Sequence, residues 1–386
     1  MDKTSKLITI AIIVVVVLII AYLVYKSQSH NVPVATEPIK VTAEPIKIGF
    51  IGPLTGDGAT IGENIKVALE IARDEINQEG GINGRQIEII FEDGKCDAKT
   101  AVNAANKLIN IDKVSIIIGG TCSSETLAVA PLAEKSKVIL FSPASTNPKI
   151  ADAGDYIFRD VPSDSFQGSF AAEYIKNNLK LNKAAVLKCL SDWCLGVGDA
   201  FKAKFKELGG NIVAEESFQQ DARDLRSQLT KIKASNPEVI YFVSYTEATI
   251  PGIKQAKELG IKALLFGADA WSDPKIWQEL GKIGDGAMYV EPANKDLPES
   301  FVTEMNKRTG GKEINVYAPR AYDALKILAS LMKQVGTDST AIKNALYQVK
   351  NYQGIADNYT FDNRGEVTEA KYVVKKVENG KAVEVK

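Results

Sequence analysis

The stretch IKIGFI at residues 46–51 opens a regular alternation that decides the fold. Three further runs rich in β-branched residues follow, separated by segments of helical period: QIEIIF at 86–91, VSIIIGG at 114–120 and VILFSP at 138–143. Between the first two runs, apolar residues recur at helical spacing up to Ile76, and the pair Gly80-Gly81 ends that helix. Repeats of strand, helix and strand predict a parallel sheet covered by helices, which is the α/β class.

A second alternation of the same kind begins near Pro162. It predicts four more strands: AAVLKCL at 184–190, NIVAEESF at 211–218, EVIYFVS at 238–244 and ALLFGAD at 263–269. We therefore expect two doubly wound lobes with parallel sheets. Since such sheets bind ligands outside the carboxyl ends of their strands, two facing lobes predict an interlobe cleft. The expected division is residues 46–162 and 290–371 for lobe 1, and residues 163–289 and 372–386 for lobe 2.

Residues 1–26 are a candidate membrane anchor or signal segment. Leu7–Tyr25 contains no charged residue, and a helix of that length spans about 28 Å, close to the hydrocarbon thickness of a bilayer. The apolar part of a signal peptide is usually only about 7–15 residues long, so we expect one uncleaved transmembrane helix with the folded part outside the cytoplasm. A cleaved signal and a secreted or periplasmic protein are the alternative. Residues 27–45 contain three prolines and no apolar period, which predicts an extended linker.

The charge balance and the composition argue against several classes of protein. The chain of 386 residues has 47 Lys and Arg against 48 Asp and Glu, so it offers no excess of positive charge to a nucleic-acid backbone. His30 is the only histidine, which argues against a zinc site and against a histidine-based nucleophile. No phosphate-binding loop is present. We therefore expect a protein that is not an enzyme, with no metal, no cofactor and no nucleic-acid partner.

Polar residues gather at the ends of two predicted strands. One strand leads into Gly119-Gly120 and then into a helix that begins near Glu125, where Ser123 or Ser124 can cap and unpaired N–H groups can bind an anion such as a carboxylate. The next strand ends in a turn that carries the hydroxyls of Ser145 and Thr146 beside a free carbonyl. Together the two loops predict a cradle for a zwitterion. A plain helix cap and a plain turn explain the same pattern equally well.

Several long segments carry a family resemblance. They include the sequence from IGPLTGDGATIGENIKVALEIARDEINQEGG onward at 51–102, IIGGTCSSETLAVAPLAEKSKVILFSPAST at 117–146, FRDVPSDSFQG at 158–168, VSYTEA at 243–248, FGADAW at 266–271 and FDNRGEV at 361–367. They closely resemble the leucine/isoleucine/valine-binding protein family of ABC-transporter solute receptors, and the resemblance covers about residues 46–376. It implies the type I periplasmic-binding fold, in which two lobes joined by three crossovers close on an amino acid by a hinge motion.

The resemblance also implies roles for individual residues. Ser123 matches the family serine that holds the α-carboxylate of the ligand. Ala144 and Thr146 match the carbonyl and the hydroxyl that hold the amino-acid head group. Tyr245 matches a tyrosine of the second lobe, and Asp269 stands where the family often has an acid for the ammonium group. A helix or turn cap is the alternative role for Asp269.

The expected side-chain pocket departs from the family pattern. Ile61 replaces an aromatic residue of the first loop, and Leu195 replaces the aromatic residue of a turn in the second lobe. Trp193, Trp271 and Tyr317 are candidates to restore aromatic contact, and core packing is the alternative role of the two tryptophans.

The four cysteines all lie in the part expected outside the cytoplasm, and an even number there permits two disulfides. Cys96 and Cys122 sit where the resembled family has its disulfide. Cys189 and Cys194 match no common family feature, and we expect a second bridge between them.

Two classes of function remain. The resemblance implies an extracytoplasmic solute-binding protein, expected to be a monomer, that captures a branched-chain or related small amino acid or amide and delivers it to ABC permease subunits in the membrane. The alternative is the ligand-binding component of a membrane sensor. A sensor would need a separate signalling partner, because only the short segment 1–6 is expected inside the cell.

Overall fold

A computed structural model describes residues 14–23 and 44–385 of the chain. The chain divides into two units, Met1–Thr42 and Ala43–Lys386. Residues 14–23 form a helix within the first unit. The remainder of the anchor predicted at 7–25, and all but the end of the linker predicted at 27–45, lie outside the described residues. None of the helices in the described ranges combines the length and the apolar character that crossing a membrane requires.

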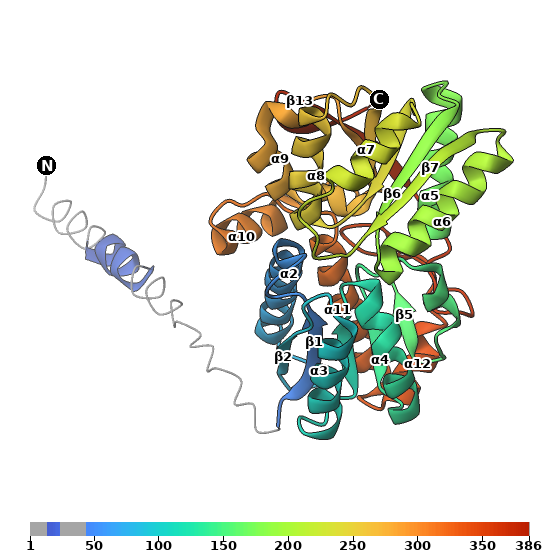
Figure 1. Cartoon of the computed structure of the whole chain (residues 1–386). Coiled ribbons are helices and arrows are strands. Elements are labelled where there is room, and N and C mark those ends of the chain that lie inside the picture. Colours follow the sequence, from blue (N-terminus) through green and yellow to red (C-terminus); the bar gives the residue numbers. More distant parts are fainter. Residues whose placement is uncertain (1–13, 24–43, 386) are drawn as a thin grey trace, which may run out of the picture. The chain divides into compact units, whose positions relative to one another are not determined.

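The first lobe of the second unit is built on a five-stranded parallel sheet with strand order β2-β1-β3-β4-β5 (Figure 1). The strands are β1 (Ile46–Gly52), β2 (Ile87–Asp93), β3 (Ile116–Gly119), β4 (Ile139–Ser142) and β5 (Ile157–Arg159). The helices are α2 (Ala59–Gln78), α3 (Ala98–Asn110), α4 (Ser123–Ser136), α10 (Glu299–Thr309), α11 (Ala318–Val335) and α12 (Ser339–Leu346), with a 3-10 turn η1 (Pro148–Asp152) and a small hairpin of β11 (Tyr352–Gln353) and β12 (Asn358–Tyr359).

Both faces of this sheet are buried, which explains why its strands read as nearly continuous apolar runs. In β1, Ile48 and Phe50 point to one face and pack with residues of α2 and α11. Ile51 points to the opposite face and packs with residues of α3 and α4. Successive side chains of a strand alternate between faces, so each strand contributes to both cores.

The second lobe is built on a seven-stranded sheet with strand order β14-β13-β10-β9-β8-β6-β7. Its strands are β6 (Lys183–Cys189), β7 (Asn211–Phe218), β8 (Val239–Val243), β9 (Leu264–Gly267), β10 (Met288–Pro292), β13 (Tyr372–Glu378) and β14 (Lys381–Glu384). The first five in this list pair in parallel, and β13 and β14 add an antiparallel edge. Its helices are α5 (Asp164–Glu173), α6 (Asp192–Glu207), α7 (Arg226–Ala234), α8 (Thr246–Glu258) and α9 (Pro274–Leu280), with the short turns η2 (Tyr174–Asn178), η3 (Asp269–Ser272) and η4 (Gly281–Gly284).

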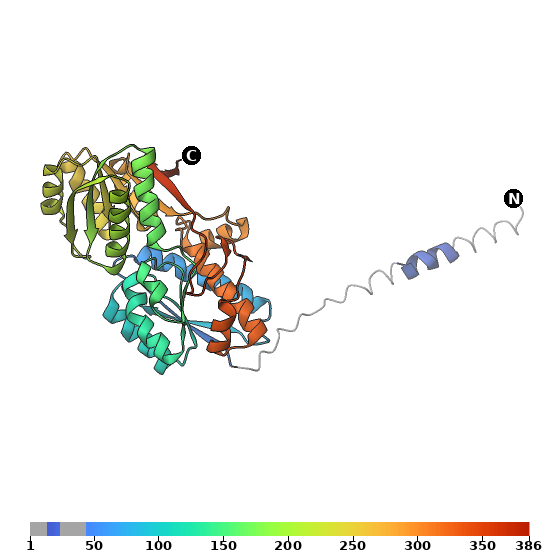
Figure 2. The same ribbon diagram turned by 90° about the vertical axis from the view of Figure 1, so that its right-hand side faces the viewer.

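The chain passes between the lobes three times, and the C-terminal strands end in the second lobe (Figure 2). Two of the passages lie between β5 and α5 and just before β13, and the third follows β10. This strand continues to Pro292 because it pairs with β13 over its whole length.

Helix α6 begins at Asp192, so Leu195, which we expected in a turn, lies on a helix. The Ser191 hydroxyl caps the helix by accepting a hydrogen bond from the backbone N–H of Cys194 at 3.3 Å. Two glycines in the first turns weaken the helical signal of the sequence. One of them, Gly198, is needed for packing, because a Cβ there would lie 2.9 Å from the Lys188 side chain. Trp193 also lies on this helix. Because it is two residues from Leu195, the two side chains point to different faces of the helix.

Two disulfides link the four cysteines, Cys96 to Cys122 and Cys189 to Cys194, as the sequence analysis expects. The first joins the loop after β2 to the residue that precedes α4. The second joins the end of β6 to the first turn of α6. Both therefore brace loops at the carboxyl ends of parallel strands, where the candidate site lies.

Candidate ligand-binding site

A cavity lies between the two lobes. Its lobe 1 wall consists of Pro53, Gly58, Ile61, Thr121, Cys122, Ser123, Ala144 and Tyr317. Its lobe 2 wall consists of Trp193, Tyr245 and Ala270. The cavity thus lies between the carboxyl ends of strands from both sheets, as the doubly wound topology predicts.

Polar contacts join the lobes around the cavity. The Arg223 guanidinium pairs with the Asp57 carboxylate at 2.6 Å between Nη2 and Oδ1. The side-chain amide of Asn147 donates to the backbone carbonyl of Asp192 at 2.6 Å. Both contacts cross from one lobe to the other, so they hold the lobes together over the site.

The start of α4 presents backbone donors to the cavity. The chain reaches it from β3 through Gly120, where a Cβ would lie only 2.4 Å from the Glu125 side chain. Ser123 is the first residue of α4 and lines the cavity, and its Oγ accepts a hydrogen bond from the backbone N–H of Asn147 at 3.1 Å. The first N–H groups of a helix have no partner within the helix and favour an anion. This end of the cavity therefore suits a carboxylate.

Glu125 fixes the position of this helix start. Its fully buried carboxylate accepts hydrogen bonds from the backbone N–H groups of Cys96 at 3.0 Å and Cys122 at 2.9 Å. Burial raises the pKa of Glu125 to about 7, against the effect of those hydrogen bonds. The disulfide and this carboxylate join the same two loops.

The loop after β4 is held by hydrogen bonds from within lobe 1 and from the start of α5 in lobe 2. The Ser142 hydroxyl accepts from the backbone N–H of Ser145 at 2.9 Å, and the Thr146 carbonyl accepts from the backbone N–H of Asp164 at 2.8 Å. Ala144 lines the cavity, and in the described part of the chain its carbonyl accepts no hydrogen bond. The Thr146 hydroxyl is buried and also lacks a partner.

Two buried carboxylates, Asp164 and Asp269, lie behind the lobe 2 side of the cavity. Asp269 Oδ2 accepts a hydrogen bond from the hydroxyl of Tyr317 at 2.6 Å, which links the two lobes. Its Oδ1 has no partner among the described residues, and neither oxygen of Asp164 has one. Unpaired buried carboxylates are costly, and a positive group placed among these atoms would stabilise them. The unpartnered polar atoms here are Thr146 Oγ1, Asp164 Oδ1 and Oδ2, Asp269 Oδ1, and Oε1 and Nε2 of Gln167.

The electrostatics of the two acids agree with this geometry. Burial raises the pKa of Asp164 well above its usual range, and the neighbouring Asp269 carboxylate raises it further, while Thr146, Arg159 and Trp193 oppose the shift. Burial also raises the pKa of Asp269, while the hydrogen bond from the Tyr317 hydroxyl and the nearby Gln167 side chain oppose the rise. A cation beside both carboxylates would stabilise their charged forms. No group of three or more His, Cys, Asp or Glu side chains in the described ranges is arranged to hold a metal ion.

Aromatic and aliphatic groups form the remaining wall. The rings of Trp193 and Tyr245 lie 4.8 Å apart between centroids, and both residues are nearly fully buried. Tyr317 faces them from lobe 1, beside Ile61. These four are the predicted pocket-wall and tyrosine residues that the structure brings together.

Three other predicted site residues lie elsewhere. The Ser145 hydroxyl turns into lobe 1, where it donates to the Gly120 carbonyl at 2.8 Å. Leu195 is 37% exposed and lines a surface groove beside Asn147. Trp271 is fully buried in the core of lobe 2, 5.6 Å from Phe242 between ring centroids, and Ala270 takes its place in the cavity wall.

Sequence analysis missed Asp164 and Gln167 as site residues. Both belong to the quoted segment FRDVPSDSFQG, but an acid directly after a serine that follows a proline is typical of the first turn of a helix. Ser163 does cap α5, by accepting from the backbone N–H of Ser165 at 3.3 Å. Asp164 and Gln167 are three residues apart, so they lie on the same face of a helix. That spacing is the sequence signal that could have identified them as a polar pair.

Comparison with known proteins identifies the class to which this fold and this site belong. The periplasmic binding protein family matches residues 45–382. An amino acid binding protein of Pseudomonas aeruginosa is 30% identical over 343 residues, which cover 85% of this chain and 89% of that protein. Such relatives are solute-binding proteins and not enzymes.

Two solved structures extend the match to the fold. The leucine-binding protein LivK of Thermotoga maritima is 27% identical with a TM-score of 0.82, and the match covers 88% of this chain and 98% of that chain. The branched-chain amino acid transporter substrate-binding protein LivJ of Streptococcus pneumoniae, in complex with isoleucine, is 26% identical with a TM-score of 0.80, covering 88% and 100%. The chain belongs to the periplasmic binding protein family, and its type I α/β fold is the predicted one.

Proposed function

We propose that this protein captures a free α-amino acid with an uncharged, apolar side chain. The observation that carries the proposal is the cluster of unpartnered buried polar atoms on Thr146, Asp164 and Asp269 opposite the donor-rich start of α4. An ammonium group needs acceptors in a dry cleft, and a carboxylate needs donors. Ser123 lines the cavity, and the two carboxylates lie directly behind its wall, Asp269 against Tyr317 and Asp164 against Trp193.

The positions of the donors and acceptors decide how the charged groups of the ligand are oriented. The α-carboxylate lies at Ser123 and the N–H groups that begin α4. The ammonium group lies among the Ala144 carbonyl, the Thr146 hydroxyl and the carboxylates of Asp164 and Asp269. Two acids and two neutral acceptors exceed what a ligand without an ammonium group could satisfy.

The ligand side chain faces Ile61, Trp193, Tyr245 and Tyr317. No Lys or Arg stands among the residues that line the cavity, so an acidic ligand side chain would find no partner there. This supports a leucine-like side chain, which agrees with the leucine and isoleucine named for the two structural relatives.

Binding of L-leucine should weaken as the pH falls. The pKa of each acid is raised by burial, so lowering the pH protonates carboxylates that the ammonium group needs. Affinity should fall by up to about tenfold per pH unit for each proton taken up. Calorimetric titration of the full-length chain between pH 7 and 5, in two buffers of different ionisation enthalpy, measures both the affinity and the protons released on binding.

The stability of the ligand-free protein should depend on pH in the opposite direction, rising as the pH falls. A raised pKa in the folded state gives stability that is present at low pH and is lost as the pH rises through the raised values.

Failure of L-leucine and of every other neutral amino acid to bind at pH 7 would contradict the proposed function. Binding that is equally tight at pH 5 and pH 7 would contradict the role of the acids.

We further propose that the protein is a monomeric receptor of an ABC transporter, held outside the cytoplasm by residues 7–25 and delivering its ligand to permease subunits after hinge closure of the lobes. The uncharged run Leu7–Tyr25 and the family membership support this arrangement. Fractionation of cells that express the full chain should find it in membranes. A mature soluble form that begins after Tyr25 would overturn the anchor while leaving the receptor function intact.

A further inference from the structure

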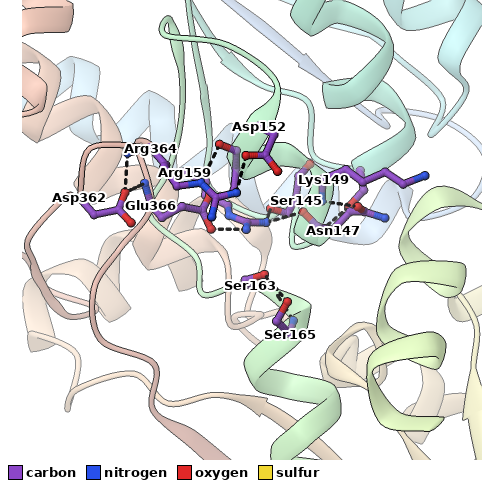
Figure 3. Close-up of polar contacts among 12 residues, drawn as sticks. Ser145, Asn147, Lys149, Asp152, Arg159, Ser163, Ser165, Asp362, Arg364 and Glu366 are labelled. Carbon is purple, nitrogen blue, oxygen red and sulfur yellow. Dashed lines mark hydrogen bonds and ion pairs between the residues drawn. The ribbon is translucent and has the colours of Figure 1, made fainter. Parts of the chain in front are cut away.

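We call the loop after β4, residues 143–147, the ligand loop. A buried ion pair lies directly behind it (Figure 3). Arg159 ends β5 and is completely buried. Its guanidinium pairs with the carboxylate of Glu366, which comes from the turn after β12 and is far away in the sequence. Removing two charged groups from water carries a free-energy penalty that their mutual attraction often does not recover. Stability alone is therefore a weak explanation for this buried salt bridge.

The same guanidinium holds the backbone of the ligand loop. Arg159 Nη1 donates to the carbonyl of Ser145 at 3.2 Å and to the carbonyl of Asn147 at 2.9 Å. These two carbonyls flank Thr146, whose own carbonyl accepts from the backbone N–H of Asp164. Three successive carbonyls are thus fixed from behind. The groups that remain for a ligand are the Ala144 carbonyl and the Thr146 hydroxyl.

Glu366 is itself held in place. Its backbone N–H donates to Asp362 Oδ1 at 3.0 Å, and the carbonyl of Gly365 accepts from the backbone N–H of Arg159 at 3.1 Å. The same turn is fixed to η1 by the pair of Arg364 and Asp152 at 2.6 Å (Figure 3). The turn at 362–366 therefore sets the position of the guanidinium, and the guanidinium sets the position of the loop.

We propose that Arg159, oriented by Glu366, is a positioning residue for ligand recognition: its two hydrogen bonds to the loop aim the Thr146 hydroxyl and the Ala144 carbonyl at the ammonium group of the ligand. This inference rests on the proposed function. The planar guanidinium reaches the two carbonyls through Nη1 and the Glu366 carboxylate through Nη2 at the same time, whereas the single ammonium of a lysine keeps the charge but not that spread of donors. The positive charge near Asp164 also opposes the rise of the pKa of that acid.

A double-mutant cycle on the full-length chain separates positioning from plain stability. Calorimetry with L-leucine at pH 7 measures Kd for the native chain, Arg159→Lys, Thr146→Ala and the double variant. Thr146→Ala should weaken binding by about 10- to 150-fold, since it removes a hydrogen bond to a charged group. Arg159→Lys should weaken binding by about tenfold alone but by less than about threefold in the Thr146→Ala background, because it acts through that loop.

Arg320→Lys is the matched control. Arg320 is also buried and also donates to two backbone carbonyls, those of Asp160 and Ala293, but it does not touch the ligand loop. Both lysine variants should lower the melting temperature, and only Arg159→Lys should change Kd. If Arg159→Lys does not yield folded protein, Glu366→Gln takes its place in the cycle, since an amide oxygen still accepts from the guanidinium without its charge.

The outcomes are distinguishable. Native protein that binds none of the neutral amino acids would overturn the proposed function. Native binding with additive effects of Arg159→Lys and Thr146→Ala, or with an equal loss of affinity in Arg320→Lys, would overturn the positioning role while leaving the proposed function intact.

Discussion

Asp164→Asn and Asp269→Asn are each expected to weaken L-leucine binding by about 100-fold or more and, at the same time, to stabilise the ligand-free protein. Removing one charged partner of a buried pair typically costs about 3–5 kcal/mol. One carboxylate remains in each variant, so the lower end of that range applies, which corresponds to roughly 100-fold in Kd. Without ligand, each variant removes one of two neighbouring buried like charges, and the free energy of unfolding at pH 7 should rise by about 1 kcal/mol or more.

Asp323→Asn is the matched control for this prediction. Asp323 is equally buried, but its carboxylate accepts from the backbone N–H groups of Ile355 and Ala356 and from the hydroxyl of Tyr359, each at 2.8 Å. The same substitution there should destabilise the protein and leave Kd unchanged. Equilibrium unfolding and calorimetry on the three variants provide both quantities. A loss of stability in Asp164→Asn would mean that its carboxylate is structural.

Removal of the Cys96–Cys122 bridge is expected to have the largest effect on stability. The bridge closes a loop with a sequence separation of 26, for which the chain-entropy model gives about 3.5 kcal/mol. Its loss should also weaken ligand binding, because Cys122 lines the cavity and directly precedes Ser123. Glu125 would still join the two loops through its hydrogen bonds, so a folded variant should be obtained.

The second bridge provides the comparison. The Cys189–Cys194 bridge closes a much shorter loop, for which the same model gives about 2 kcal/mol. Denaturant unfolding of Cys96→Ala/Cys122→Ala and of Cys189→Ala/Cys194→Ala should therefore rank the first variant as less stable. Equal or reversed stabilities would show that strain or residual structure in the unfolded chain outweighs loop entropy. Four alkylatable thiols in the native, non-reduced protein would mean that neither bridge forms.

Most of the fold could be predicted because its elements have strong local signals. The runs at 46–51, 86–91 and 238–244 are rich in β-branched and aromatic residues, and the structure contains a parallel strand at each of them. The late antiparallel edge and the end of β10 depend on pairing between distant segments. No local pattern records where β10 stops, because its last residues are fixed by β13.

Candidate residues such as Ser123 and Thr146 can be proposed from the sequence alone, because the strand before each of them has a strong local signal. Leu195 could not be placed correctly without the true start of α6, because the face of a helix that a residue occupies depends on register. Trp271 and Ala270 are neighbours in η3, and only packing against Phe242 decides which of them enters the core. Asp164 requires knowledge of both lobes, since its partner Asp269 comes from another strand end.

The central claim is that the site recognises both ends of a free α-amino acid, and one calorimetric comparison tests it most directly. L-leucine, its deaminated analogue 4-methylpentanoate and L-leucine methyl ester share the same side chain and differ only in the head group. We expect L-leucine to bind and each analogue to bind at least about 100-fold more weakly, because each deletes one charged half of the zwitterion. Binding of 4-methylpentanoate as tight as that of L-leucine would contradict the account, since the carboxylates of Asp164 and Asp269 would then face no ammonium group.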